Sequence, residues 1–115
     1  MKAKLRIPLE RDVQRAVLEY LAWRKIFAWR NQTTGIYDPR RGVFRAGQTL
    51  RGVPDVLGIL PDGRFLGVEV KRPGKHLEPH QQEFQTRATA LKAVCVCVHS
   101  AAELDAALTA EGVFK

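Results

Sequence analysis

Three charged residues lie inside an otherwise apolar stretch of the sequence, residues 52–72, which reads GVPDVLGILPDGRFLGVEVKR. Asp55, Glu69 and Lys71 share this stretch with valine, leucine, isoleucine and phenylalanine. Burying charge costs free energy unless a partner compensates it, so these residues need a compensating group. Two carboxylates and a lysine beside a divalent cation suit phosphodiester hydrolysis, because together they can activate water and stabilise charge on a phosphate.

The turn between the two apolar segments decides whether the carboxylates meet. Residues 61–63, Pro-Asp-Gly, are predicted to form a hairpin turn, because glycine supplies positive φ and aspartate tolerates it. If this loop has three residues, Asp55 lies directly opposite Glu69, with Cβ atoms about 5 Å apart. A two-residue loop would shift the pairing by one residue. Side chains alternate along a strand, so Lys71 falls on the same face as Glu69.

Two facing carboxylates repel each other, and a divalent cation between them makes the arrangement favourable. Mg²⁺ prefers hard oxygen ligands, so the expected ligands are Asp55, Glu69 and the backbone carbonyl of Val70. Lys71 would then orient or activate a water beside the metal. The alternative is a surface salt-bridge cluster of Asp55, Lys71 and Glu69 on the solvated face of an edge hairpin.

Glu10 and Gln81 are two further candidates for this site. On a helical wheel Glu10 falls within about 20° of Val17, on the apolar stripe, which directs a third acid towards the sheet. The alternative is a first-turn carboxylate that interacts with the helix dipole. Gln81 shares a helix face with Phe84 and Ala88, and a buried amide needs a partner. That partner would be a phosphate or the lysine, or else the backbone.

Hydrophobic periodicity and turn residues predict a single domain over residues 1–115 with the element order α-β-β-β-α-β-α. Helices are expected over residues 8–24, from Pro79 onwards, and after the Ser100–Glu103 capping box, ending near Gly112. Strands are expected over residues 26–32, 53–60, 64–71 and 93–99, and residues 33–52 form a loop or irregular hairpin. This order predicts an α/β or α+β fold in which helices cover a mixed sheet.

The chain carries 19 Lys and Arg against 12 Asp and Glu, a formal charge of +7, which favours nucleic acid as the partner. Basic residues gather in the loops on either side of the expected catalytic strands, where they would follow phosphates. We therefore expect DNA contacts from Arg30, Asn31, Arg40, Arg41, Arg45, Arg51, Arg72 and Lys75. The alternatives are solvated arginines on a flexible loop and a basic surface that serves only solubility.

Cysteine usage and hydropathy bear on the cellular compartment. Cys95 and Cys97 share one face of a valine-rich strand, and we interpret them as reduced thiols in the core. A zinc site needs about four ligands, and His99 is the only nearby addition. No stretch approaches the roughly 20 apolar residues of a membrane span, and the basic start lacks the apolar region of a secretory signal. The expectation is a cytoplasmic protein without membrane contact.

The order of these motifs resembles a known family. Pro54-Asp55 followed by Glu69-Val70-Lys71 resembles the PD-(D/E)xK nuclease motif. Together with ERDVQRAVLEYL, WRN, GVPDVLGIL, GRFLGVEVKRPG and LEPHQQEF, it makes the chain similar to the VRR-NUC family over roughly residues 7–99. The resemblance implies a restriction-endonuclease-like core and endonuclease activity that depends on Mg²⁺ or Mn²⁺. It implies catalytic roles for Glu10, Asp55, Glu69, Lys71 and Gln81, with the metal held by Asp55, Glu69, Val70 and Glu10.

The stand-alone phage type of this family is similar to Holliday-junction resolvases, which implies branched DNA as substrate and a homodimer making two symmetric cuts. It also implies a role in DNA repair or recombination in the cytoplasm of a bacterium or phage-infected cell, close to the nucleoid. The apolar patch of a dimer is expected at Trp23, at Ile26 and Phe27, or at Val113-Phe114. Trp23 and Trp29 are interpreted as core or dimer-interface residues.

Two other functions are compatible with the same residues. One is a non-catalytic nucleic-acid-binding module of the same fold, although the complete Asp, Glu and Lys set argues against it. The other is a nuclease that acts on flaps, single strands or RNA. Comparing cleavage in Mg²⁺ with cleavage in EDTA distinguishes the nuclease from the non-catalytic module. A panel of substrates distinguishes a nuclease for branched DNA from one that acts on flaps, single strands or RNA.

Overall fold

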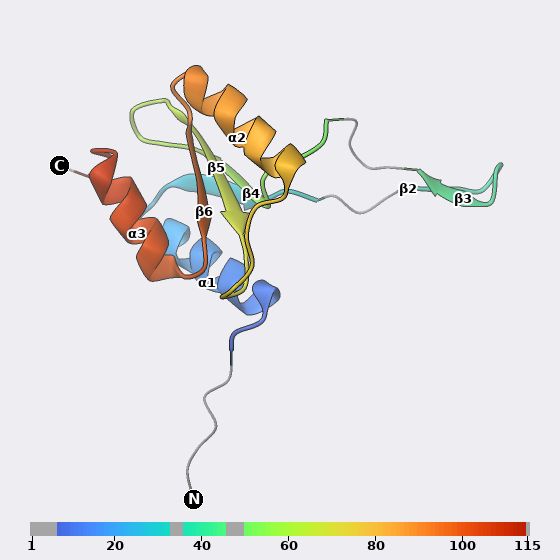
Figure 1. Cartoon of the computed structure of the whole chain (residues 1–115), viewed down its shortest axis with the longest axis horizontal. Helices are drawn as coiled ribbons and strands as arrows, with labels where there is room; N and C mark the ends of the chain where they lie inside the picture. The colour runs from blue at the N-terminus through green and yellow to red at the C-terminus, as the bar shows by residue number, and fades with distance from the viewer. Residues whose placement is uncertain (1–6, 33–35, 46–49, 115) are drawn as a thin grey trace, which may run out of the picture.

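A computed structural model describes residues 7–32, 36–45 and 50–114 of the chain, which form a compact α+β fold (Figure 1). Nine elements follow one another along the sequence: α1 (Glu10–Trp23), β1 (Phe27–Arg30), β2 (Ile36–Asp38), β3 (Val43–Arg45), β4 (Val56–Ile59), β5 (Phe65–Val70), α2 (Pro79–Ala90), β6 (Val94–Val98) and α3 (Ala101–Ala110). The three predicted helices and the four predicted main strands are therefore all present.

Four strands form a mixed sheet in the order β1-β4-β5-β6, in which β5 and β6 are parallel and the other neighbours antiparallel. The predicted element order omits two short strands. β2 and β3 form a separate antiparallel hairpin within the segment that was expected to be a loop or irregular hairpin. Figure 1 shows this hairpin projecting away from the sheet.

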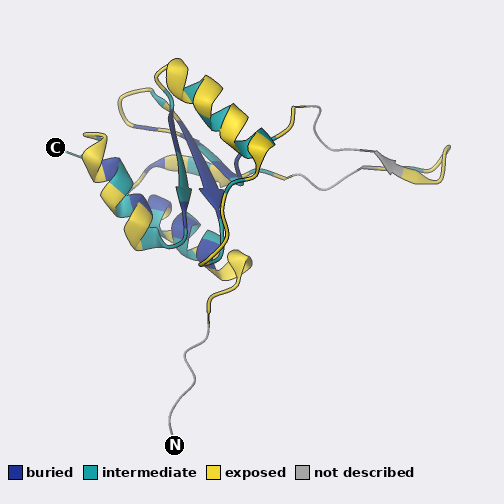
Figure 2. Cartoon of the chain, viewed as in Figure 1, coloured by how far each residue is buried: buried dark blue, intermediate teal, exposed yellow. Residues whose placement is uncertain are grey.

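One face of the sheet forms the hydrophobic core. Leu66, Val68 and Val70 of β5 point into it and are completely buried, as alternation along a strand requires. Helices α1 and α3 cover this face with five buried residues: Val13, Val17, Leu21, Leu104 and Leu108. Each buried leucine or valine contributes about 1.5–3 kcal/mol through the apolar surface removed from water. Figure 2 shows that burial is concentrated here, whereas α2 is largely exposed.

Local signals set the ends of the outer helices. Ser100 caps α3, because its Oγ accepts a hydrogen bond from the Glu103 amide at 3.1 Å, as the capping box predicts. Asp105 ties the two core helices together, accepting hydrogen bonds from Tyr20 Oη at 2.6 Å and Arg24 Nη2 at 3.1 Å. Helix α1 begins two residues after Pro8, which lies outside it.

The hairpin register has the predicted three-residue turn. Leu60 and Arg64 flank the turn, where the Leu60 amide donates to the Arg64 carbonyl at 2.9 Å and Gly63 has φ +91°. Val56 consequently pairs with Val68, and Ile59 with Phe65. Asp55 lies one residue before β4 begins, so it occupies the position next to the last pair of the ladder.

The structure corrects several predictions about which apolar residues lie in the core and which could form a dimer interface. Trp23 is 73% exposed at the last residue of α1, so it is not a core residue, and Trp29 is also exposed. Ile26 is buried, because the chain turns inward between α1 and β1. Val113 and Phe114 pack against the core, and the Arg24 guanidinium lies 3.9 Å from the Phe114 ring centre. Neither Ile26 nor the 113–114 pair is therefore free to form a dimer patch.

Candidate active site

Glu69 is the only charged residue among the buried residues that the structure describes. It lies on the face of β5 opposite the core, beside Cys97 of β6 in the parallel register, and is 5% exposed. Its Oε1 accepts a hydrogen bond from Gln81 Nε2 at 3.1 Å. Its Oε2 is buried and has no hydrogen-bond partner in the described part of the chain. A buried oxygen without a partner is costly, so this atom marks a place where a partner is needed.

Asp55 reaches the same place because β4 separates from β5 just before its first residue. In a continued antiparallel ladder the Val70 amide would donate to the Pro54 carbonyl. Instead, the Val70 amide donates to Asp55 Oδ2 at 2.8 Å, and the Pro54 carbonyl accepts from Asn31 Nδ2 at 3.2 Å. The Asp55 carboxylate thus replaces a backbone acceptor.

Asn31, which follows β1, stabilises the chain at the point where β4 and β5 separate. In addition to its side-chain bond to Pro54, its amide donates to the Asp55 carbonyl at 2.7 Å. The sequence interpretation placed Asn31 among the DNA-contacting residues. The structure gives it contacts on either side of Asp55 that fix the backbone of this carboxylate.

The charges around Glu69 act strongly on its ionisation. The pKa of Glu69 is raised from its ordinary value of 4.5 to about 9, mainly by burial, with contributions from the neighbouring Asp55 carboxylate and, to a smaller extent, from Glu10. Lys71 opposes this effect and lowers the pKa. Three of the residues expected at the site, Asp55, Glu10 and Lys71, are therefore close enough to Glu69 to change its charge.

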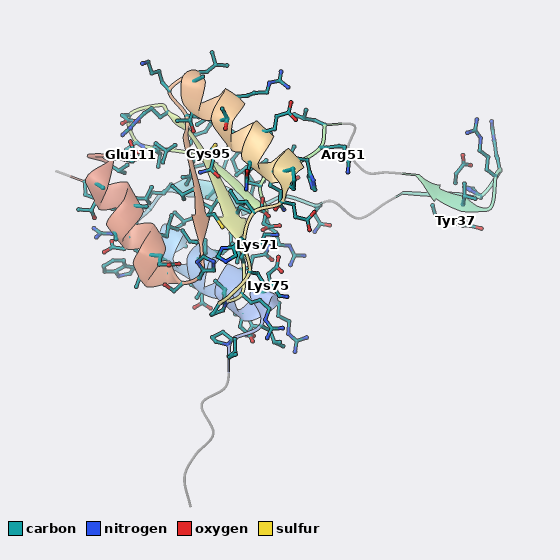
Figure 3. All side chains as sticks on the ribbon, viewed as in Figure 1. Tyr37, Arg51, Lys71, Lys75, Cys95 and Glu111 are labelled. Carbon is teal, nitrogen blue, oxygen red and sulfur yellow. The ribbon has the colours of Figure 1, made fainter. Side chains whose placement is uncertain are left out.

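Lys71 follows β5 directly and is half-buried. Its amide donates to the Val98 carbonyl at 3.0 Å, which continues the parallel pairing of β5 with β6 by one residue. The following loop is fixed to the start of α3, because His99 Nε2 lies 2.9 Å from the Lys75 carbonyl and His99 Nδ1 lies 3.1 Å from Glu103 Oε2. Figure 3 shows Lys71 and Lys75 on the same side of the molecule, next to the first turns of α1.

Glu10 is the first residue of α1 and is exposed. It acts on Glu69 through its charge, and it does not complete a three-acid cluster. Within the described ranges, no group of three His, Cys, Asp or Glu side chains is placed so that it could hold a metal ion. The two strand carboxylates, at Asp55 and Glu69, therefore form the centre of the site.

Gln81 bonds to the backbone, which was one of the alternatives expected for it, and to Glu69, which was not among the expected partners. Its Nε2 donates to Glu69, and its Oε1 accepts from the Glu78 amide at 2.9 Å, which is the reciprocal bond of a capping box at the start of α2. The side chain is thereby fixed in two directions. Gln81 connects the beginning of α2 to the buried carboxylate.

Cys97 is a site neighbour that the sequence interpretation treated as core. It lies beside Glu69 in the sheet, and the pKa of its thiol is raised by burial first and then by the Glu69 charge. Predicting that Cys97 lies beside Glu69 would have required knowing that β5 and β6 pair in parallel and in this register. The sequence alone places Cys95 and Cys97 on one face without saying what that face meets.

The predicted DNA-contacting residues fall in three places. Arg40 and Arg41 are exposed at the turn of the β2–β3 hairpin, the hairpin on which Figure 3 labels Tyr37. The side chain of Arg45 lies outside the described residues. Around the sheet, Arg30, Arg51 and Lys75 are exposed, and Arg72 is half-buried with its Nε lacking a hydrogen-bond partner in the described residues.

We compared the chain with protein-family models, with curated proteins and with solved structures. Nothing matches. The candidate site therefore stands on its own geometry. None of the helices described here is both long and apolar enough to cross a membrane.

Proposed function

We propose that this protein is a metal-dependent endonuclease that hydrolyses phosphodiester bonds in DNA. The observation that carries the proposal is the buried carboxylate of Glu69, whose Oε2 has no hydrogen-bond partner among the described residues while Asp55 and Lys71 act on it from close by. Functional sites are where such perturbed groups collect. A structural salt bridge would be expected to satisfy that oxygen with the lysine.

The residues fit a hard divalent cation, Mg²⁺ or Mn²⁺. Asp55 and Glu69 supply carboxylate oxygens, and the Val70 carbonyl is a further candidate ligand. Glu10 does not form a cluster with the two strand carboxylates, so of the two expected modes, direct and through water, we propose the one through water. The pKa of Glu69 supports this assignment, because burial, and then the neighbouring Asp55 carboxylate, disfavour the charged form of Glu69, and a bound cation would favour that form again. Bound cation would supply Lewis-acid activation of the phosphate and of a water molecule.

The side chains around the carboxylates have distinct roles in this proposal. Lys71 positions the attacking water and stabilises negative charge on the phosphate. Gln81 fixes the orientation of the Glu69 carboxylate through its bond to Oε1 and leaves Oε2 available. Asn31 fixes the backbone on both sides of Asp55.

The resemblance to the VRR-NUC family supports a restriction-endonuclease-like core, branched DNA as the substrate, and a cytoplasmic location in a bacterium or phage-infected cell. The formal charge of +7 supports a nucleic-acid partner. A homodimer is supported by an exposed apolar strip on the sheet face opposite the core, where Phe27 pairs with Ile59 and Ile59 with Phe65. Trp29 extends this strip, its ring centre 5.1 Å from that of Phe27.

The test is cleavage of a labelled four-way junction, with matched linear duplex, flap, single-stranded DNA and RNA, in Mg²⁺ and in EDTA. Asp55→Asn, Glu69→Gln and Lys71→Ala should each lower the cleavage rate at least about a hundredfold while DNA is still bound. Glu19→Gln, an exposed carboxylate of α1, is the matched control and should leave the rate unchanged.

Cleavage retained by any of the three site variants would overturn the assignment. Binding of the junction without cleavage in Mg²⁺ would favour the non-catalytic module instead. If four-way junctions are cut no faster than linear duplex, the branched-substrate part of the proposal fails.

A further inference from the structure

A second concave surface lies next to the candidate site, on the other side of the start of α2. It is a groove of about 380 Å³ between α2 and the segment that precedes β4, lined by Leu50, Arg51, His80, Glu83, Phe84, Arg87, Ala88 and Leu91. This volume falls in the range of small-ligand sites. Nothing in the proposed chemistry uses this groove.

The groove combines apolar and basic residues. Its apolar lining residues, here called the floor, are Leu50, Phe84, Ala88 and Leu91, and Leu91 is 84% exposed. Two arginines also line it, Arg51 from the loop and Arg87 from the helix, and neither guanidinium makes a hydrogen bond or ion pair to any residue that the structure describes. Glu83 adds one carboxylate, so the lining keeps a positive charge, and a ligand with a flat apolar part and a negative charge matches it.

The groove and the carboxylate site share a wall. His80 lines the groove, and its neighbour Gln81 donates to Glu69. The loop that carries Arg51 is pressed against this wall, because a Cβ on Gly52 would lie 2.1 Å from the His80 carbonyl oxygen. Figure 3 shows Arg51 beside the first turn of α2. A nucleic acid bound at the carboxylates would therefore extend past the groove.

We propose that the groove binds an unpaired nucleotide of the substrate, its base on the Phe84 side of the floor and its phosphate between Arg51 and Arg87. This inference rests on the proposed function, since the DNA must lie at the carboxylate site. Every base has a π-face that can stack on an aromatic ring, so the groove would select unpaired DNA without selecting sequence. The preferred substrate is then a duplex with unpaired nucleotides beside the cleavage position.

Binding is measured by fluorescence anisotropy in EDTA, where the proposed metal-dependent cleavage does not occur. The probes are a blunt duplex and the same duplex with a short single-stranded extension carrying 2-aminopurine. The wild-type chain should bind the extended duplex about tenfold more tightly, which is the scale of one stacked base, and should change the 2-aminopurine fluorescence.

Phe84→Leu and Arg87→Gln should each remove most of this preference while leaving affinity for the blunt duplex within about twofold. Arg15→Gln, an exposed arginine of α1 away from the groove, should change neither affinity. Arg87 is exposed, so its variant is expected to fold even where the Phe84 variant does not, and thermal unfolding checks both.

Three outcomes would overturn the inference: no wild-type preference for the extension, equal losses on the two duplexes, or a preference unchanged in Arg87→Gln. Failure of the proposed function is a separate result, because it appears as absent cleavage in Mg²⁺. A chain that prefers the extension but cleaves nothing would keep the groove assignment and lose the nuclease.

Discussion

At the scale of single residues, the site depends on one carboxyl group that the fold has removed from water. Glu69 is held by Gln81 on one oxygen and has its other oxygen without a partner among the described residues. Its raised pKa has a direct consequence for stability. Between 4.5 and about 9 the folded protein keeps a proton that the unfolded chain has released.

Metal-free protein should therefore lose stability as pH rises across this window, and Glu69→Gln should lack this loss. The difference in the free energy of unfolding between wild type and Glu69→Gln should change by about 1.4 kcal/mol per pH unit where the folded and unfolded states differ by one full proton. It should level off above the pKa of Glu69 in the folded protein. Urea unfolding in EDTA at a series of pH values measures it. Parallel pH profiles for wild type and Glu69→Gln would contradict the buried, protonated Glu69.

A substitution at Asn31 can distinguish a role in positioning Asp55 from a role in contacting DNA. Because Asn31→Ala removes the side-chain bond to the Pro54 carbonyl and leaves only the backbone bond to Asp55, it should lower the cleavage rate about tenfold or more while the dissociation constant for DNA changes less than about twofold. Gln32→Ala, at the exposed neighbouring residue, is the control. A rise in the dissociation constant that matches the fall in rate would instead make Asn31 a DNA contact.

At the scale of elements, the active site is built by the point where two strands part. The turn at residues 61–63 sets the β4–β5 register, and the ladder ends at the Val56–Val68 pair. The next backbone acceptor is replaced by the Asp55 carboxylate. Helix α2 then places Gln81 over Glu69, and Gly52 permits the close approach of the preceding loop to that helix.

Gly52→Ala should destabilise the protein by about 3 kcal/mol or more, combining left-handed backbone strain at φ +79° with the clash against His80. Gly63→Ala is the matched control, because Gly63 has φ +91° and open space around its added Cβ, so about 1–2 kcal/mol is expected. Urea unfolding compares the two variants. Equal losses would mean that the approach of this loop to α2 does not constrain the fold.

At the scale of the whole molecule, one sheet face is covered by α1 and α3, and the β1 side of the other face remains open. Phe27, Ile59 and Phe65 lie in register there, exposed to solvent, on three neighbouring strands. An apolar strip of this kind favours association with a second copy. The projecting β2–β3 hairpin, with Arg40 and Arg41 at its turn, adds a separate basic surface.

Phe27→Glu should convert the expected dimer to a monomer in sedimentation equilibrium, since a charge on each copy would face the other copy's apolar strip. Phe27 is 69% exposed, so unfolding free energy per chain should be little affected. Leu91→Glu is the control and should leave the dimer intact, because Leu91 is an even more exposed apolar residue on the α2 side. A wild-type monomer, or a dimer unaffected by Phe27→Glu, would remove this face as the interface.

The sequence by itself determined the main elements and the face on which the charges lie. Strand alternation placed Glu69 and Lys71 together, and the Pro-Asp-Gly sequence located the turn. The structure then decided the register, because it shows the three-residue loop rather than the two-residue alternative. Strand alternation and turn composition are local rules, each acting within a few residues of the chain. The same rules correctly predicted the cap of α3 at Ser100.

Tertiary structure alone decided what surrounds the carboxylates. The parallel pairing of β5 with β6 brought Cys97 beside Glu69, and the divergence of β4 left the Pro54 carbonyl to accept a hydrogen bond from Asn31 next to Asp55. Burial of Ile26 and exposure of Trp23 likewise follow from how α1 meets the sheet. Such outcomes depend on contacts between distant segments, which hydrophobic periodicity cannot encode. The charges of residues 52–72 are predictable as a group, whereas the buried Glu69 oxygen, which has no partner in the part of the chain that the structure describes, is visible only in the fold.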